Sequence, residues 1–147
     1  MNATQLAAVT TDPASKAVLE FLSVLETKKV DNLLSIWDEN GIFELPFSHK
    51  GIPSLYHPKF EGRQCIYELF QALLPGESFK FKEIALYPMI NQEYVFIEFI
   101  GDITQLDRGI KYTNRYCALA HTRKGKILLF REYFHAIIRQ NFEASGF

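Results

Sequence analysis

Glu132 is the residue best suited to proton transfer, because it lies within an aromatic and aliphatic segment. Residues 128–134 read LLFREYF. If this segment is a β-strand, Glu132 shares one face with Leu128, Phe130 and Phe134. A carboxyl group among such side chains is desolvated, which favours its neutral form and raises its pKa. We therefore expect Glu132 to act as a general acid or base near neutral pH.

A structural role for the same carboxyl group is equally open. Arg131 precedes Glu132 directly, and Arg115 lies in the neighbouring predicted strand. An ion pair with either arginine would shift the pKa of the Glu132 carboxyl group, and so would a catalytic environment. The sequence thus leaves two interpretations of Glu132, a catalytic acid or base and a member of a buried ion pair.

Hydrogen-bond donors occur at every second position of another predicted strand. Tyr112, Asn114 and Tyr116 therefore share a face of that strand. We expect Asn114 and Tyr116 to be catalytic, donating hydrogen bonds to a carbonyl group or an oxyanion. The alternative is that Asn114 satisfies a β-bulge and that the tyrosines are packing partners across strands. Packing is the favoured interpretation for Tyr112.

Two more acidic residues lie in predicted strands and are candidates for substrate binding. Glu98 alternates with Phe96 and Ile100, so it faces either the interior or an ion-pair partner across the sheet. Glu44 stands next to Leu45. Alternation turns Glu44 to the opposite face from Leu45 unless a bulge intervenes.

A long irregular segment, residues 48–60, is a further candidate for function. It is rich in Gly and Pro and carries His49, Tyr56 and His57. Loops of this length within a compact domain are often functional. We expect Tyr56 to contact a ligand and the segment to act as a lid, whereas exposed loop histidines are usually only solvated.

The sequence lacks the motifs of cofactor, metal and nucleophilic sites. It contains no Gly-x-Ser-x-Gly, no phosphate-binding glycine-rich loop and no dinucleotide fingerprint. Cys65 and Cys117 belong to no Cys-x-x-Cys and have no His at metal-ligand spacing. We therefore predict that the protein uses no cofactor and binds no metal.

Length and charge exclude several classes of protein. The 147 residues fit one domain, and 16 basic against 17 acidic side chains give no basic surface for nucleic acid. No apolar run approaches the roughly 20 residues of a membrane helix. The N-terminus lacks the layout of a signal peptide. We therefore expect a cytoplasmic protein without nucleic-acid or membrane partners.

Apolar periodicity and turn residues predict helices first and strands last. Residues 1–12 are expected to be a flexible N-terminus and 13–147 a single domain. The predicted elements are helices that begin at 12–13, 31 and 61–62, and strands at 42–47, 79–87, 94–101, 110–122 and 127–138. Asn40 and Gly41 are expected to end the second helix. Short turns make the last four strands antiparallel neighbours.

The helices must then cover one face of the sheet, because each element has to bury an apolar side. We predict an α+β fold in which a curved, mixed, mainly antiparallel sheet wraps around the N-terminal helices. Such an arrangement makes a cone with a pocket between its layers. The aromatic residues, 13 Phe, seven Tyr and one Trp, are then expected in the core, the pocket or a dimer face.

Four parts of the chain resemble the SnoaL-like, or ketosteroid-isomerase-like, branch of the nuclear-transport-factor-2-like superfamily. They are residues 41–47 (GIFELPF), 60–63 (FEGR), 112–116 (YTNRY), and 125–127 (GKI) followed by 131–133 (REY). The phenazine-biosynthesis A/B proteins share the last two. The resemblance extends over nearly the whole chain. It implies a cone-shaped fold, commonly a homodimer, with a hydrophobic pocket.

The resemblance also implies where chemistry takes place. Phenazine-biosynthesis A/B proteins have a functional Glu at the position of Glu132, and related strands often carry an acid at that of Glu98. Steroid isomerases instead have their base, an Asp, immediately before a Pro, where this chain has Leu45. That departure argues against steroid isomerisation. The Asp-Arg-Asp set of limonene epoxide hydrolases is not recognisable either.

The expected function is that of a cofactor-independent enzyme, of isomerase, cyclase or condensation-assisting type, acting on a small hydrophobic metabolite. The alternatives are a non-catalytic binding protein for such a ligand and a dimerisation module that uses Tyr133, Val95 and Ile97. We expect a homodimer in either case. The residues expected to contact the ligand are Glu98, Glu44, Tyr56, Tyr112, Phe130, Phe134 and Trp37.

Overall fold

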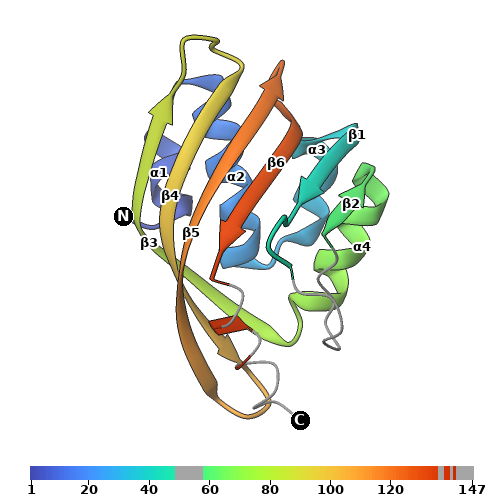
Figure 1. The fold of residues 1–147 in the computed structure, drawn as a ribbon, viewed down its shortest axis with the longest axis vertical. Coiled ribbons are helices and arrows are strands. Elements are labelled where there is room, and N and C mark those ends of the chain that lie inside the picture. The colour runs from blue at the N-terminus through green and yellow to red at the C-terminus, as the bar shows by residue number, and fades with distance from the viewer. Residues whose placement is uncertain (49–57, 136–137, 140, 142–147) are drawn as a thin grey trace.

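The computed structural model describes residues 1–48, 58–135, 138, 139 and 141. Helices come first and long strands last, as the sequence predicts (Figure 1). The helices are α1 (Ala3–Val9), α2 (Pro13–Thr27), the 3-10 helix η1 (Val30–Asn32), α3 (Leu33–Ile36) and α4 (Arg63–Leu73). The strands are β1 (Trp37–Glu44), β2 (Lys59–Glu61), β3 (Glu77–Pro88), β4 (Tyr94–Gln105), β5 (Ile110–Arg123) and β6 (Lys126–Phe134).

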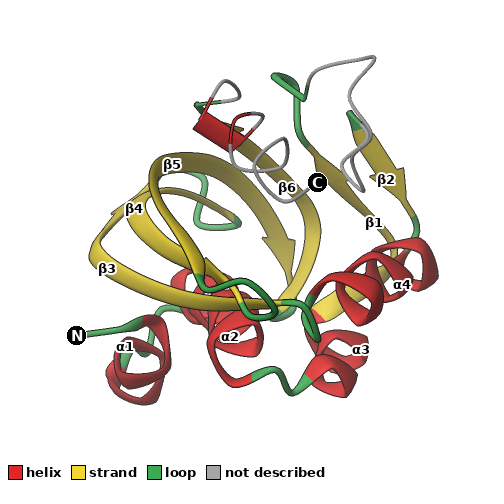
Figure 2. Cartoon of the chain, turned by 90° about the horizontal axis from the view of Figure 1, so that it is seen from below, coloured by secondary structure: helices red, strands yellow, loops and turns green. Residues whose placement is uncertain are grey.

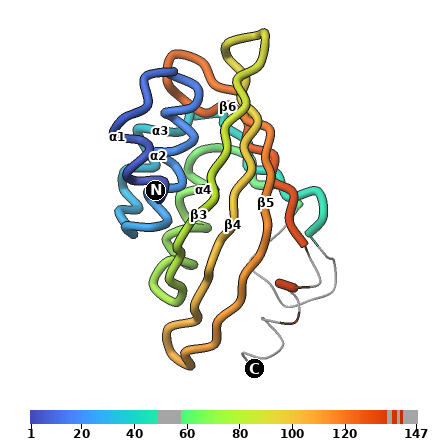
Figure 3. The backbone as a smooth tube through the Cα atoms, turned by 90° about the vertical axis from the view of Figure 1, so that its left-hand side faces the viewer, coloured from blue at the N-terminus to red at the C-terminus, as the bar shows by residue number. Residues whose placement is uncertain are grey.

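The strands form one six-stranded sheet in the order β2-β1-β6-β5-β4-β3. β1 runs parallel to β6, and the other neighbouring pairs are antiparallel. β2 was not predicted; it pairs with β1 at the end of the segment that was expected to be a loop. The sheet curls, and the helices lie along one side of it (Figures 2 and 3). The predicted curved, mainly antiparallel sheet against N-terminal helices is therefore confirmed.

The core forms between α2 and the inner face of the sheet. Asp12 caps α2 as the sequence predicts, because its carboxylate accepts a hydrogen bond of 2.9 Å from the backbone N–H of Ser15. The inward face of α2 carries Phe21, which is 1% exposed. Edge-to-face contacts with ring centroids 5.0–6.0 Å apart join Phe21 to Trp37, Phe43, Phe70 and Phe130.

The N-terminus holds a helix where the sequence predicted a flexible stretch. Asn2 and Gln5 form a capping box, in which each side chain accepts a hydrogen bond from the other residue's backbone N–H. Glu26 of α2 accepts hydrogen bonds from the backbone N–H groups of Ala3 and Thr4, at 3.1 and 2.8 Å. A seven-residue helix is marginal alone. Contacts with α2, distant in the sequence, stabilise α1, so local periodicity did not reveal it.

The second predicted helix is shorter than expected. η1 and α3 end at Ile36, and β1 begins at Trp37, so Asn40 and Gly41 lie inside a strand rather than at a helix end. A Cβ atom at Gly41 would lie 2.7 Å from Cε3 of Trp37. Gly41 therefore allows the Trp37 ring to approach the strand closely. The glycine that the sequence analysis interpreted as a helix end is required by this packing instead.

One irregularity changes the predicted face of β6. Ile127 pairs with Thr122 and Leu129 pairs with His121, so Leu128 is an extra residue between them. Such a bulge shifts the alternation by one position. Ile127, which is fully buried, takes the inner position that strict alternation assigned to Leu128. From residue 129 to Phe134 the predicted alternation holds, and β6 ends there rather than at the predicted residue 138.

Candidate functional site

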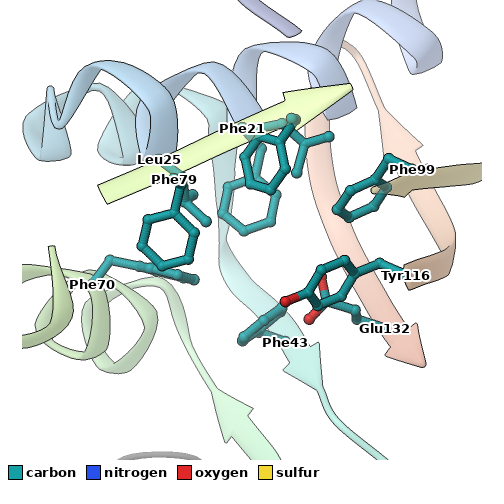
Figure 4. Close-up of a pocket in the computed structure, with 10 residues that line it drawn as sticks. Phe21, Leu25, Phe43, Phe70, Phe79, Phe99, Tyr116 and Glu132 are labelled. Carbon is teal, nitrogen blue, oxygen red and sulfur yellow. The ribbon is translucent and has the colours of Figure 1, made fainter. Parts of the chain in front are cut away.

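A small cavity lies between the helices and the inner face of the sheet, and Glu132 forms part of its wall (Figure 4). The cavity volume is about 30 Å³, which is room for about two water molecules. Aromatic rings from α2, α4, β1, β3 and β4 enclose most of it. These rings are Phe21, Phe43, Phe70, Phe79, Phe81 and Phe99.

The pairing of β5 and β6 turns Glu132 toward this cavity. Glu132 lies opposite Ala118, and Phe130 lies opposite Ala120. Both alanines and Phe130 are fully buried, so this side of β6 is the inner face of the sheet. The short alanine side chain opposite Glu132 leaves space for a carboxyl group in an otherwise filled interior.

The Glu132 carboxyl group lacks a hydrogen-bond or ion-pair partner among the described residues. Burial among apolar side chains raises the pKa of Glu132 to about 8. The half-buried side chain borders the cavity with the surface that it still exposes. At neutral pH Glu132 is therefore mainly a neutral acid that can donate a proton.

The alternative ion pair of Glu132 is not formed. Arg131 points to the outer face, where its Nε lies 3.4 Å from a carboxylate oxygen of Glu44. Arg115 is exposed and borders a hollow on the same outer face. Strand alternation separates both arginines from Glu132, because each stands an odd number of positions from the inward-facing residue of its strand.

Tyr116 is the polar residue that the structure brings next to Glu132. It lies opposite Phe99 on β4, and the two rings stack with centroids 5.1 Å apart and an interplanar angle of 11°. Figure 4 shows the side chains of Tyr116 and Glu132 at the same cavity, with the Tyr116 hydroxyl pointing toward Phe43. The phenol and the carboxyl group therefore face the same small cavity.

Asn114 has a structural role in this arrangement. Its amide nitrogen donates a hydrogen bond of 3.2 Å to the backbone oxygen of His135, and its amide oxygen accepts one of 3.3 Å from the backbone N–H of the same residue. The amide oxygen also accepts from the backbone N–H of Arg115 at 2.9 Å. Asn114 is 2% exposed. Its amide thus ties the backbone of His135, directly after β6, to β5, and the β4–β5 register runs through Asn114 without a bulge.

Tyr112 contacts a residue to which the sequence analysis gave no role. Its hydroxyl accepts a hydrogen bond of 3.0 Å from Nη1 of Arg139. The same Arg139 nitrogen lies 2.9 Å from a carboxylate oxygen of Glu77. Tyr112 therefore takes part in a polar cluster on the inner side of the sheet, in addition to packing.

The other predicted ligand contacts lie apart from the cavity. Glu44 and Glu98 are on the outer face, Glu44 paired with Arg131 and Glu98 exposed. Trp37 and Phe130 are fully buried in the core, where they pack on Phe21 rather than line the cavity. Phe134 packs against Tyr116 with ring centroids 6.3 Å apart. Tyr56, His49 and His57 lie outside the described residues.

A second, larger hollow lies on the outer face of the sheet. Its volume is about 500 Å³. Glu98, Cys117 and Tyr133 stand in register across β4, β5 and β6 along its floor. Burial raises the pKa of the Cys117 thiol, and the charges of Glu98 and Glu132 add to this effect. The inner cavity and the outer hollow share Phe99 and Tyr116 among the residues that line them.

The sequence analysis missed most of the cavity wall. Phe21, Phe70 and Phe79 come from helices and a strand distant from Glu132, and each was identified only as an apolar position. Arg139 lies beyond the last strand and had no periodic signal. Within the residues that the structure describes, no group of His, Cys, Asp and Glu could hold a metal ion, and none of the helices there is long and apolar enough to span a membrane.

Comparisons with known sequences identify one family. The model of the SnoaL-like domain matches residues 18–130. The uncharacterized protein YesE of Bacillus subtilis (strain 168) is 25% identical over 129 residues, covering 86% of this chain and 84% of YesE. The uncharacterized PhzA/B-like protein PA3332 of Pseudomonas aeruginosa is 24% identical over 133 residues, covering 90% of each chain.

Comparison with solved structures supports the fold. The crystal structure of a Bacillus subtilis protein named "Putative Isomerase" superimposes with a TM-score of 0.81 at 22% identity. The match covers 100% of this chain and 99% of the other. At this identity the likeness concerns the fold, with its helices on one side of a curled sheet.

Proposed function

The chain belongs to the SnoaL-like domain family, and on that premise we propose that it is a cofactor-independent enzyme that uses Glu132 for acid–base chemistry on a small, largely apolar metabolite. The observation that carries this proposal is the Glu132 carboxyl group on the cavity wall, without a polar partner among the described residues and with a pKa raised to about 8. A group with a pKa near the working pH transfers protons efficiently in both directions.

The geometry supports a reaction that moves one proton to and from a substrate next to an oxygen atom. The protonated Glu132 would donate its proton to the substrate, and the resulting carboxylate would take a proton back from another position. Tyr116, which lines the same cavity as Glu132, would hold the substrate oxygen through its hydroxyl. Isomerisation consists of such proton transfers, and in cyclisation and assisted condensation they accompany the formation of the new bond.

Side chains that line the cavity must move before a ligand can enter it. A cavity of about 30 Å³ is far below the several hundred Å³ of a typical ligand site. The aromatic side chains Phe79 and Phe81, which lie on edge strand β3, would have to change rotamer when a ring-sized ligand enters. An apolar lining with a single carboxyl and a single phenol favours a substrate with one or two oxygen atoms.

Deuterium exchange tests this proposal without knowledge of the natural substrate. Wild-type protein in deuterated water should accelerate exchange of the hydrogens next to the carbonyl group in at least one of a panel of small cyclic ketones, followed by proton NMR. Glu132→Gln should lower the rate by about 100-fold or more. Glu98→Gln, which changes an exposed carboxylate on the outer face, is the matched control and should retain the rate.

Equal rates for wild type and Glu132→Gln would remove Glu132 from the mechanism. A second candidate function, a non-catalytic binding protein, is favoured by one observation: the amide of Asn114 is bound to the backbone of His135, so it is not directed at a ligand. Tight retention of an apolar ligand without any ketone exchange would support that function instead.

A further inference from the structure

A polar hollow lies on the outer face of the sheet, where β3, β4 and β5 extend past the end of β6. Its volume is about 490 Å³, which lies in the range of small-ligand sites. The polar side chains that line it are Lys80, Asp102, Thr104, Lys111 and Thr113. Among the residues that the structure describes, none lines both this polar hollow and the one that contains Glu98. The polar hollow is therefore a separate feature of the outer face.

The register of the strands places two lysines on opposite sides of β4. Lys80 on β3 pairs with Asp102, and Lys111 on β5 pairs with Thr104. Ile103, which stands between Asp102 and Thr104, is buried in the core, so alternation turns these four side chains outward. Neighbouring strands are only about 4.8 Å apart. Both ammonium groups can therefore reach an anion that lies above Thr104.

The negative charge of Asp102 is already balanced by its own neighbours. Its Oδ1 accepts a hydrogen bond of 2.6 Å from the Thr113 hydroxyl, and its Oδ2 lies 3.0 Å from Nζ of Lys82. These contacts, helped by the charges of Lys82 and Lys80, hold the pKa of Asp102 below its ordinary value. Asp102 is therefore ionised at neutral pH and offsets the charge of Lys82.

Lys80 and Lys111 carry charges that are not offset in this way. Both side chains are exposed, and neither has a carboxylate oxygen within 4.0 Å among the described residues. The whole chain has a net charge of -1, yet positive charge is in excess at this hollow. The sequence analysis considered only the total charge of the chain, so it missed this local excess.

We propose that the polar hollow binds a small phosphate-bearing anion, either free phosphate or the phosphate group of a small metabolite. Lys80 and Lys111 supply charge from two sides, and each ammonium group is a donor of up to three hydrogen bonds. Hydrogen bonds with ionised partners are roughly twice as strong as neutral ones. The site lies on the opposite face of the sheet from Glu132, so the inference goes beyond the proposed function and does not depend on it.

The arrangement of donors favours phosphate over a carboxylate ligand. The Thr104 hydroxyl on the floor of the hollow is a third donor, between the two lysines. A tetrahedral phosphate group can direct one oxygen to each lysine and another to Thr104. A planar carboxylate has two oxygen atoms and cannot serve all three donors in this way.

Titration with sodium phosphate at constant ionic strength, followed by backbone amide NMR, tests the site. The amide resonances of residues 102–104 and of their neighbours on β3 and β5 should shift in a saturable way. In the double variant Lys80→Gln/Lys111→Gln, the dissociation constant should rise about tenfold or more, because both attracting charges are lost. Equal affinity of wild type and this double variant would overturn the proposal, as would shifts that do not saturate.

The matched control lowers the net charge equally at a distance from the hollow. Lys16→Gln/Lys59→Gln replaces two exposed lysines on α2 and β2. Its dissociation constant should stay within about twofold of wild type, because exposed charges at a distance are screened by salt. An effect as large as that of Lys80→Gln/Lys111→Gln would show that only the total charge matters, and would overturn the proposed site.

Asp102→Asn is a test with the opposite sign. Loss of the carboxylate removes a charge that repels the anion and releases Lys82 toward the hollow, so phosphate affinity should rise about threefold or more. A lower affinity in this variant would contradict the electrostatic assignment of the site.

Two further ligands define what the site recognises. If glycerol phosphate binds more tightly than inorganic phosphate, the ligand is a phosphorylated metabolite, whereas the reverse order identifies free phosphate. Acetate should bind at least about tenfold more weakly than either, since it cannot engage all three donors. Acetate binding with the affinity of phosphate would overturn the assignment to a phosphate group.

Discussion

Glu132 shows how one side chain acquires reactivity from its neighbours. Phe21, Phe43 and Phe99 line the cavity that its side chain borders, and Arg131, the adjacent cation, points to the other face of the sheet. Removal of water without a compensating charge leaves the neutral acid as the stable form. The raised pKa is therefore a consequence of strand alternation and of the aromatic wall together.

The raised pKa makes a prediction about stability. An ordinary glutamate side chain has a pKa of 4.5, whereas Glu132 has a pKa of about 8 in the folded chain, so the folded state binds its proton more tightly than the unfolded state. The stabilising contribution is complete below about pH 4.5 and is lost as pH rises to about 8. Between these values the loss is at most about 1.4 kcal/mol per pH unit.

Urea unfolding of wild type and Glu132→Gln at several pH values measures this contribution. The stability difference between the two should shift in favour of Glu132→Gln as pH rises from 5 to 8, since the amide does not ionise. Glu98→Gln should run parallel to wild type. A wild-type curve parallel to that of Glu132→Gln would mean that the folded and unfolded pKa values are the same.

At the scale of elements, β4 and β5 together hold the ring of Tyr116 in place. Gly101 lies opposite Asn114 in the register of these strands. A Cβ atom at Gly101 would lie 2.9 Å from Cε2 of Tyr116 and 3.4 Å from Cε1 of Phe81. The missing side chain of Gly101 therefore creates the space into which the Tyr116 ring fits when it stacks on Phe99.

Gly101→Ala should displace the Tyr116 ring from its stacked position on Phe99 and so disturb the candidate site. We expect destabilisation of about 1–3 kcal/mol from overpacking, together with a lower ketone exchange rate. The variant Gly76→Ala is the matched control, because its nearest atom would lie 3.9 Å away. Thermal unfolding and the exchange assay measure both effects. If Gly101→Ala had the same stability and exchange rate as Gly76→Ala, the close contact with Gly101 would not hold the Tyr116 ring.

At the scale of the molecule, the outer face of the sheet is the surface that the helices leave uncovered (Figure 2). Tyr133 lies there against Phe47, with ring centroids 5.3 Å apart. Val95 and Ile97, which were predicted to share a dimer face with Tyr133, are instead fully buried in the core. Alternation along β4 explains this correction, because its odd-numbered residues from 95 to 99 face the helices.

We propose that a second copy of the chain covers this outer face. The hollow there carries the carboxylates of Glu83 and Glu98 and the guanidinium group of Arg115 next to aromatic side chains. Opposite charges within one patch make it complementary to itself, as a two-fold interface requires. The occupant that fits this mixed surface is therefore another molecule of the same chain.

Light scattering after gel filtration tests the dimer. Wild type at micromolar concentration should have twice the 17.0 kDa mass of the chain. Tyr133→Glu should shift it to the monomer mass, since a carboxylate would be buried beside Glu98. Leu34→Glu, at a residue 40% exposed on the helix side, should remain dimeric. A monomeric wild type would contradict the proposal.

The sequence by itself determined those features that depend on neighbours a few residues apart. Turn residues and period-two patterns predicted the last four strands, Asp12 predicted the start of α2, and alternation predicted that Glu132 shares a face of its strand with Phe130 and Phe134. These signals act through backbone conformation and through the two faces of a strand. They fail where a distant contact prevails, as at Gly41, where the ring of Trp37 requires a glycine within a strand.

Only the tertiary structure decided what surrounds Glu132 and what holds Tyr116. Phe21 and Glu132 are more than a hundred positions apart in the chain, and no local pattern encodes that α2 packs over β6. The contacts of Arg139 with Glu77 and Tyr112 likewise join three separate elements. Close packing selects one mutual arrangement of these elements, and the pKa and the hydrogen-bond partners of each polar group follow from that arrangement.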